Sequence, residues 1–67
     1  MAKIQLNGKK ISIKSNFSIQ DLLKKYKLIN KKVAIEYNGT IVSKGNYKKK
    51  YLKNDDKLEI VHFIGGG

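Results

Sequence analysis

The chain has 67 residues, enough for one small domain with a modest core but hardly enough for an enclosed active site. It contains no cysteine, which excludes disulfides and thiolate metal sites, and we expect a cytoplasmic protein without a secretory leader. No run approaches the roughly 20 apolar residues of a membrane span. The net charge of +10 comes from lysine alone, whereas specific nucleic-acid recognition favours arginine. We therefore interpret the lysines as a compositional bias on a solvated surface, ahead of an acidic protein partner or nucleic acid.

The first predicted element is a β-hairpin. Apolar and polar residues alternate from Ile4 to Leu6 and again from Ile11 to Ile13, with Asn7-Gly8 between the two runs. An Asn-Gly pair between two alternating runs is the strongest short-range signal for a tight hairpin turn. The resulting ribbon has one apolar face, which the next element has to cover.

A helix is predicted from Ser18 to about Lys27. Ser18 and Asp21 have the spacing of a reciprocal capping box, and Phe17 lies directly before the cap, where a hydrophobic staple begins. The helix has a single apolar stripe that we expect to pack on the hairpin. This stripe is formed by Ile19, Leu22, Leu23 and Tyr26.

In the second half of the chain, the sequence predicts three shorter elements and a final strand. Residues 33–37 form a predicted strand, Asn38-Gly39 a second tight turn, and residues 40–42 the short return strand. Residues 43–46 are predicted to be a loop, and the spacing of Tyr47, Tyr51 and Leu52 predicts one or two helical or 3₁₀ turns. Turn chemistry at residues 54–56 then leads into the last strand, residues 57–63.

The two faces of the last strand are predicted to differ, with Leu58, Ile60 and His62 on one face and Glu59, Val61 and Phe63 on the other. We expect Leu58 and Ile60 to face the helix. Val61 and Phe63 should then be exposed, and exposed apolar residues beside a strand end can mark a partner surface. His62 is the only histidine, and without cysteine or a second histidine a structural role is favoured over a metal site.

This order of elements predicts an α+β fold. If the last strand returns beside the first and parallel to it, the result is a mixed sheet of four to five strands packed on one main helix. This is the β-grasp arrangement of ubiquitin-like folds. We expect residues 1–64 to form a single domain and Gly65-Gly66-Gly67 to form a flexible tail. A tail without side chains can act only through its backbone and the Gly67 carboxylate.

Three segments resemble the ThiS family, the sulfur carrier proteins of thiamine biosynthesis. They are residues 33–42, the acidic turn Asp55-Asp56, and above all the ending from Lys57 to Gly67, which reads Lys-Leu-Glu-Ile-Val-His-Phe-Ile-Gly-Gly-Gly. The resemblance covers essentially the whole chain, whose strongly basic charge departs from the family pattern. It implies a carrier rather than an enzyme. Partner proteins would carry out the chemistry on its last residue.

The resemblance implies that a ThiF-like adenylyltransferase activates the Gly67 carboxylate and that sulfur from a persulfide donor converts it to a thiocarboxylate. Thiazole synthase (ThiG-like) then receives the sulfur for the thiazole ring of thiamine. The carrier itself binds no metal or cofactor, since ATP and Mg²⁺ are used by its activating partner, and alone it is expected to be a monomer without membrane contact. The implied roles are covalent attachment at Gly67, threading of the tail at Gly65 and Gly66, and partner docking at Val61, Phe63 and Ile64.

Three alternatives share parts of this pattern. A molybdopterin-type sulfur carrier would use the same chemistry at the same carboxylate. A ubiquitin-like modifier would instead be transferred to lysines of other proteins. A basic nucleic-acid-binding module would have an incidental glycine tail, and its affinity for nucleic acid would fall steeply with salt.

Overall fold

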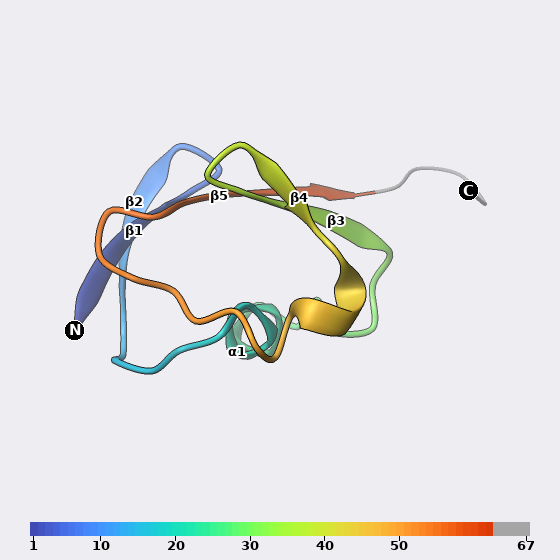
Figure 1. Ribbon diagram of the computed structural model, residues 1–67, viewed down its shortest axis with the longest axis horizontal. Coiled ribbons are helices and arrows are strands. Elements are labelled where there is room, and N and C mark those ends of the chain that lie inside the picture. The colour runs from blue at the N-terminus through green and yellow to red at the C-terminus, as the bar shows by residue number, and fades with distance from the viewer. Residues whose placement is uncertain (63–67) are drawn as a thin grey trace.

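The computed structural model describes residues 1–62, and Phe63 to Gly67 lie outside the described part (Figure 1). The described residues form one sheet and one α-helix that covers a single face of it. The predicted boundary between domain and tail, after residue 64, falls outside this range. The elements in chain order are β1 (Ala2–Leu6), β2 (Lys9–Ile13), α1 (Ile19–Lys25), β3 (Val33–Tyr37), β4 (Thr40–Val42), the 3₁₀ helix η1 (Lys44–Asn46) and β5 (Lys57–His62).

The sheet has five strands in the order β2-β1-β5-β3-β4. β1 and β5 run parallel, while the pairs β1–β2, β3–β4 and β3–β5 are antiparallel. The last strand of the chain is therefore the central strand of the sheet. This arrangement confirms the predicted mixed sheet of the β-grasp type.

Both Asn-Gly pairs form the predicted hairpin turns. Asn7 and Gly8 have φ angles of 49° and 85°, and Asn38 and Gly39 have φ angles of 49° and 88°. Two consecutive residues with positive φ are the signature of a type I′ turn, whose twist matches that of the flanking strands. Asparagine and glycine are the residues that adopt this conformation most readily.

The helix begins at the predicted capping box. The Asp21 backbone N–H donates to Ser18 Oγ at 3.1 Å, and the Ser18 backbone N–H donates to Asp21 Oδ2 at 3.0 Å. The hydrogen bond from the Ser18 backbone is the main reason why the pKa of the Asp21 carboxyl lies below its ordinary value. Both orphan N–H groups are satisfied without a contact from another element.

The helix ends earlier than predicted, at Lys25 rather than about Lys27. Lys27 adopts a φ of 59°, and the Leu28 N–H donates to the Leu23 carbonyl at 2.7 Å. These features define a Schellman motif, in which glycine is the usual residue with positive φ. Because a lysine has this position here, the sequence does not predict where the helix ends. Tyr26 becomes the C-cap and is 41% exposed, so its predicted place in the buried stripe is wrong.

The core lies between α1 and the sheet face that α1 covers. Residues Ile19, Leu22 and Leu23 of the helix are buried there, as the predicted stripe requires. The other buried residues come from the strands and from the segment between η1 and β5. They are Ile4, Ile13, Ile35, Leu58, Ile60, Tyr47 and Leu52. Phe17 and Leu28 pack at the edge of this cluster. Among the described residues, no helix has the length and apolar character needed to cross a membrane.

The segment between β4 and β5 differs from its prediction in position. The 3₁₀ turn occupies Lys44–Asn46, which were predicted to be a loop, and precedes Tyr47 instead of following it. Tyr47 and Leu52 are buried, whereas Tyr51 is half exposed. The segment is held by backbone hydrogen bonds to the start of α1, including Ile19 N–H to the Lys50 carbonyl at 2.9 Å.

Candidate functional site

β5 leads to the carboxyl end of the chain, and its two neighbours hold it unequally. β3 pairs with it from Leu58 to His62, while β1 pairs with it only at Lys57 and Leu58. The carboxyl half of β5 therefore has a neighbouring strand on one side. On the other side, the turn of the first hairpin forms hydrogen bonds with β5.

Asn7 extends the contact between the first hairpin and β5. Its backbone N–H donates to the Leu58 carbonyl at 2.9 Å. Its side chain then replaces the next residue of a strand, because Asn7 Oδ1 accepts from the Ile60 N–H at 2.7 Å. Asn7 Nδ2 also donates to the Ile60 carbonyl at a longer 3.5 Å. Asn7 thus continues the parallel pairing beyond the end of β1.

Asn38, in the second hairpin turn, holds the other end of β5. Its backbone N–H donates to the Lys57 carbonyl at 2.8 Å, and its Oδ1 accepts from the Lys57 N–H at 2.8 Å. Both turn asparagines therefore hydrogen-bond to the strand that leads to the tail. The sequence identified these asparagines only as turn residues, because their partners are 53 and 19 positions away.

Asp56, directly before β5, is a buried carboxylate with three hydrogen-bond donors. Tyr37 Oη donates to Asp56 Oδ2 at 2.7 Å, the Lys53 backbone N–H donates to the same oxygen at 2.7 Å, and Asn38 Nδ2 donates to Oδ1 at 3.2 Å. Burial alone would raise the pKa of Asp56, but these bonds and the Lys53 charge hold it below its ordinary value. Burial and Asp56 raise the pKa of Tyr37 to about 12.

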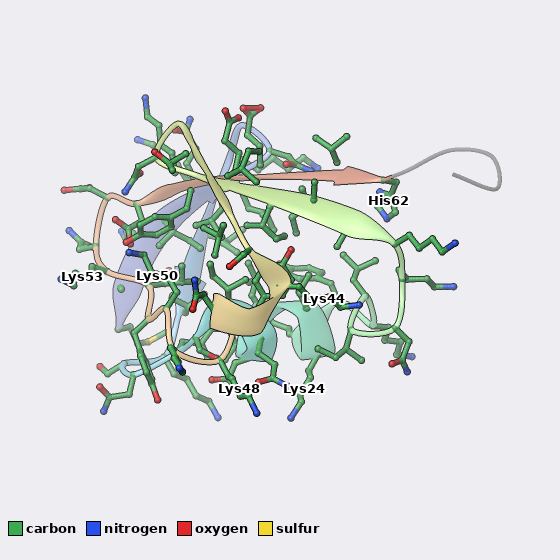
Figure 2. All side chains as sticks on the ribbon, turned by 45° about the vertical axis from the view of Figure 1, so that its right-hand side comes forward. Lys24, Lys44, Lys48, Lys50, Lys53 and His62 are labelled. Carbon is green, nitrogen blue, oxygen red and sulfur yellow. The ribbon has the colours of Figure 1, made fainter. Side chains whose placement is uncertain are left out.

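The two faces of β5 are as predicted over the described residues. Leu58 and Ile60 are buried under α1, with 1% and 8% of their surface exposed. Val61 points to the opposite face and is 56% exposed, which confirms its predicted exposure. His62 is exposed at the end of β5, opposite Val33 (Figure 2). Within residues 1–62, no group of three acidic or histidine side chains could hold a metal ion.

The remaining predicted site residues lie outside the described part of the chain. These are Phe63 and Ile64, assigned to docking, Gly65 and Gly66, assigned to threading, and Gly67, assigned to the covalent chemistry. The structure thus places the strand from which these residues continue. It also places Val61, the first residue of the predicted docking set.

The pairing between strands identifies neighbours of Val61 on β3 and β4 that the sequence did not. Ala34 is the cross-strand partner of Val61, Glu36 is the partner of Glu59, and Glu36 also pairs with Ile41 of β4. Alternation places all of them on the face opposite α1. We call this set the outer-face patch: Ala34, Glu36, Ile41, Glu59 and Val61. Alternation within each strand was visible in the sequence, but the pairing between strands was not.

The sequence matches known proteins over nearly its full length. A model of the ThiS family matches residues 3–67. The chain is 48% identical over 65 residues to the sulfur carrier protein ThiS of Bacillus subtilis, covering 96% of this chain and 98% of that one. It is also 42% identical to part of a protein named thiazole synthase from Magnetococcus marinus, where the match covers 97% of this chain and 20% of the longer protein.

The fold has a similar counterpart among solved structures. The crystal structure of the thiamine biosynthesis protein ThiS from Geobacter metallireducens matches with a TM-score of 0.83 and 25% sequence identity. The match covers 97% of this chain and 99% of that chain. Sequence and fold agree with the resemblance noted from the motifs. The chain belongs to the ThiS family.

Proposed function

We propose that the chain is the sulfur carrier of thiamine biosynthesis and that the carboxylate of Gly67 carries the sulfur. The observation that carries this proposal is the family match, which extends through residue 67 and so includes the three terminal glycines. The curated relative that matches over 98% of its own length is named a sulfur carrier protein. A carrier of this kind needs a reactive chain end and a surface for its partners, and its own side chains perform no catalysis.

The chemistry starts from a poor electrophile. The Gly67 carboxylate attacks the α-phosphorus of ATP on a ThiF-like adenylyltransferase, releasing pyrophosphate and forming an acyl-adenylate. A persulfide then attacks the acyl carbon with its terminal sulfur and displaces AMP, giving an acyl disulfide. A thiol of the activating system cleaves the sulfur–sulfur bond, leaving the thiocarboxylate and a new disulfide. ATP, Mg²⁺ and the persulfide belong to the partners.

The described residues contribute a fixed starting point for the tail. β5 is the central strand, and its inward side chains are buried in the core. Asn7 and Asn38 hydrogen-bond to its backbone at Ile60 and Lys57. A strand held in this way keeps its last described residues, Val61 and His62, fixed relative to the sheet. A partner that binds the sheet therefore meets a pre-organised strand, which limits the entropy lost on docking.

Thiazole synthase is the proposed acceptor of the sulfur. Two proteins with that name, from Magnetococcus marinus and Paramagnetospirillum magneticum, match 97% of this chain with only 20% of their own length. Each therefore contains, within a longer polypeptide, a segment similar to nearly the whole of this chain. A carrier-like segment joined to a protein of that name supports thiazole synthase as the partner of this separate carrier.

Complementation tests this function. We would express the chain in a Bacillus subtilis strain that lacks its own ThiS and measure growth without thiamine, since the two proteins are 48% identical. We expect growth with the full chain and none with a chain that lacks Gly67. Equal growth with the truncated chain would exclude Gly67 as the sulfur-carrying residue.

A further inference from the structure

We infer that Asn38 is a modification site: its side-chain amide is lost by spontaneous deamidation when the second hairpin turn opens, and the new carboxylate disrupts the buried network around Asp56. The chemistry needs only the chain and water, so it is independent of the proposed function. Both hairpin turns have the sequence Asn-Gly, the most favourable one for this reaction, but their asparagine side chains have different partners.

The reaction begins at the glycine that follows the asparagine. The Gly39 backbone nitrogen loses its proton and attacks Cγ of Asn38, which closes a five-membered succinimide ring and expels the amide nitrogen as ammonia. Water then opens one of the two ring carbonyls, and the product is aspartate or isoaspartate. Glycine obstructs the attack least, because it has no Cβ. No enzyme, oxidant or metal takes part.

The folded turn suppresses this reaction. Ring closure requires the Gly39 nitrogen to eclipse Cβ of Asn38 about the Cα–C bond. Asn38 and Gly39 have φ angles of 49° and 88°, as in a type I′ turn. The first central residue of such a turn has a ψ of about 30°, which places the following nitrogen nearly opposite Cβ. The turn must therefore open before the ring can form.

The Asn38 side chain is also held at both ends of its amide group. Oδ1 accepts from the Lys57 N–H at 2.8 Å, and Nδ2 donates to Asp56 Oδ1 at 3.2 Å. Rotation of the amide toward Gly39 breaks both hydrogen bonds. The contacts that fix the start of β5 thus protect Asn38 as well, and its reaction rate reports how often they break.

The product at position 38 conflicts with Asp56. Where Nδ2 of Asn38 now donates to Asp56 Oδ1, aspartate would place a second carboxylate oxygen. Asp56 is 8% exposed, and its other oxygen already accepts two hydrogen bonds, so it cannot turn away without losing them. Two carboxylates that share a site strongly disfavour each other's charged form. Isoaspartate instead adds a methylene group to the backbone and displaces the turn from Lys57.

Two lysines near this network offset only part of the added charge. The charge of Lys53 attracts Asp56, and the Lys50 ammonium group lies 4.8 Å from the centroid of the Tyr37 ring. Both lysines lie on the same side of the molecule (Figure 2). Neither ammonium group hydrogen-bonds to Asp56 within residues 1–62. A rearrangement is therefore needed before either one replaces the donor that deamidation removes.

Asn7 offers a comparison within the same chain. It has the same turn geometry, but its Oδ1 accepts from the Ile60 N–H at 2.7 Å, and an aspartate oxygen can keep that role. Its Nδ2 donates only to the Ile60 carbonyl, at 3.5 Å, and to no carboxylate. Conversion of Asn7 to aspartate should therefore destabilise the fold much less than the same change at Asn38.

The first experiment measures protection. The chain is incubated in mildly alkaline buffer, either folded or unfolded in guanidinium chloride, and is then cleaved after lysine. Asn7 and Asn38 fall in separate fragments, residues 4–9 and 33–44, and mass spectrometry measures the replacement of NH₂ by OH in each. We expect both to react at least about tenfold more slowly in the folded chain. Equal rates at Asn38 in the two states would overturn the inference.

The second experiment measures the effect of the product. Asn38→Asp, Asn7→Asp and Asn16→Asp each add one negative charge at a position with positive φ, which aspartate tolerates. We expect Asn38→Asp to lower the melting temperature by roughly 8–16 °C, and each of the other two by less than about 4 °C. Equal shifts in all three variants would overturn the inference.

A double variant identifies the cause of the loss. When Asn38→Asp is combined with Asp56→Asn, the amide introduced at position 56 can donate to the carboxylate at position 38. Its oxygen can still accept from Tyr37 Oη and the Lys53 backbone N–H. The melting temperature should therefore recover about half or more of the loss seen in Asn38→Asp. A double variant that melts at or below the temperature of Asn38→Asp would reject repulsion from Asp56 and with it the inference.

Discussion

Asn7 joins the turn of the first hairpin to Ile60, 53 residues later in the chain, through the 2.7 Å hydrogen bond from the Ile60 N–H to Asn7 Oδ1. The second hairpin makes the equivalent connection, since Asn38 Oδ1 accepts from the Lys57 N–H at 2.8 Å. Each asparagine therefore has two roles. Its backbone adopts the positive φ of the turn, and its side chain fixes the register of β5.

Asn7→Gly tests the second role alone, because glycine keeps the positive φ and removes only the side chain. We expect a loss of about 1–3 kcal/mol in the free energy of unfolding, since the Ile60 N–H loses its acceptor. For a domain of this size each kcal/mol corresponds to a fall in melting temperature of roughly 4–8 °C. Circular dichroism during thermal unfolding measures this fall in melting temperature.

Asn16→Gly is the matched control for this change. Asn16 also has a positive φ, 57°, but is exposed. Its replacement should change the melting temperature little. If Asn7→Gly and Asn16→Gly shifted the melting temperature equally, the side chain of Asn7 would not contribute to holding β5.

Tyr37→Phe tests the buried network around Asp56. The change removes the 2.7 Å hydrogen bond from Tyr37 Oη and leaves the ring in place. We expect a loss of about 1–3 kcal/mol in stability, measured by urea unfolding at neutral pH. A stability equal to that of the wild type would mean that the Asn38 and Lys53 donors satisfy Asp56 without Tyr37.

The same network predicts how stability depends on pH. The pKa of Asp56 is lowered in the folded state, so its contribution is present above the ordinary pKa of 3.8 and is lost as the pH falls below it. The pKa of Tyr37 is raised from 10.0 to about 12, so its contribution is present below pH 10 and is lost between those two values. The difference in tyrosinate absorbance between wild type and Tyr37→Phe should titrate near the upper value; a midpoint near 10 would contradict the buried hydrogen bond.

Val61→Ala tests the docking role assigned to this residue. Because Val61 is 56% exposed, the change should leave the melting temperature nearly unaltered. Removal of two methyl groups from a buried interface costs about 1.5 kcal/mol, so affinity for the adenylyltransferase should fall roughly tenfold. A large loss of stability together with unchanged affinity would assign Val61 to the fold instead.

Gly66→Val tests the threading role of the tail. A β-branched side chain stiffens the backbone and cannot enter a channel shaped for glycine. We expect an unchanged melting temperature and no thiocarboxylate on the variant, as measured by intact-protein mass spectrometry. Gly66→Ala should keep partial activity, because its single methyl group is smaller. Normal thiocarboxylate formation by Gly66→Val would contradict a narrow channel.

Local patterns in the sequence were sufficient for most of the fold. The Asn-Gly pairs gave both hairpins, and the spacing of Ser18 and Asp21 gave the helix start, because these signals depend on neighbouring residues only. Alternation in the last strand gave the buried positions Leu58 and Ile60 and the exposed Val61. These residues obey simple periodicity, since one face of the strand is covered by α1 and the other is open.

Features that depend on distant or unusual contacts were not predictable. Lys27 ends the helix in a conformation that glycine usually adopts, so the predicted helix was too long and Tyr26 was wrongly buried. Of the candidate site, the sequence predicted Val61 and placed Glu59 on the same face, but it did not predict their neighbours on β3 and β4. The pairing of Glu36 with Glu59 depends on the register between two strands that are separated by the nineteen residues 38–56, and composition and periodicity do not specify that register.

Intact-protein mass spectrometry shows directly whether Gly67 carries sulfur. The chain would be incubated with ATP, Mg²⁺, a ThiF-like adenylyltransferase that is active on another carrier, and a persulfide donor, beside a control chain lacking Gly67. We predict a mass gain equal to the exchange of one oxygen for one sulfur, present in the full chain and absent in the control. No adenylate and no mass gain in the full chain, with the enzyme shown to be competent, would contradict the carrier function.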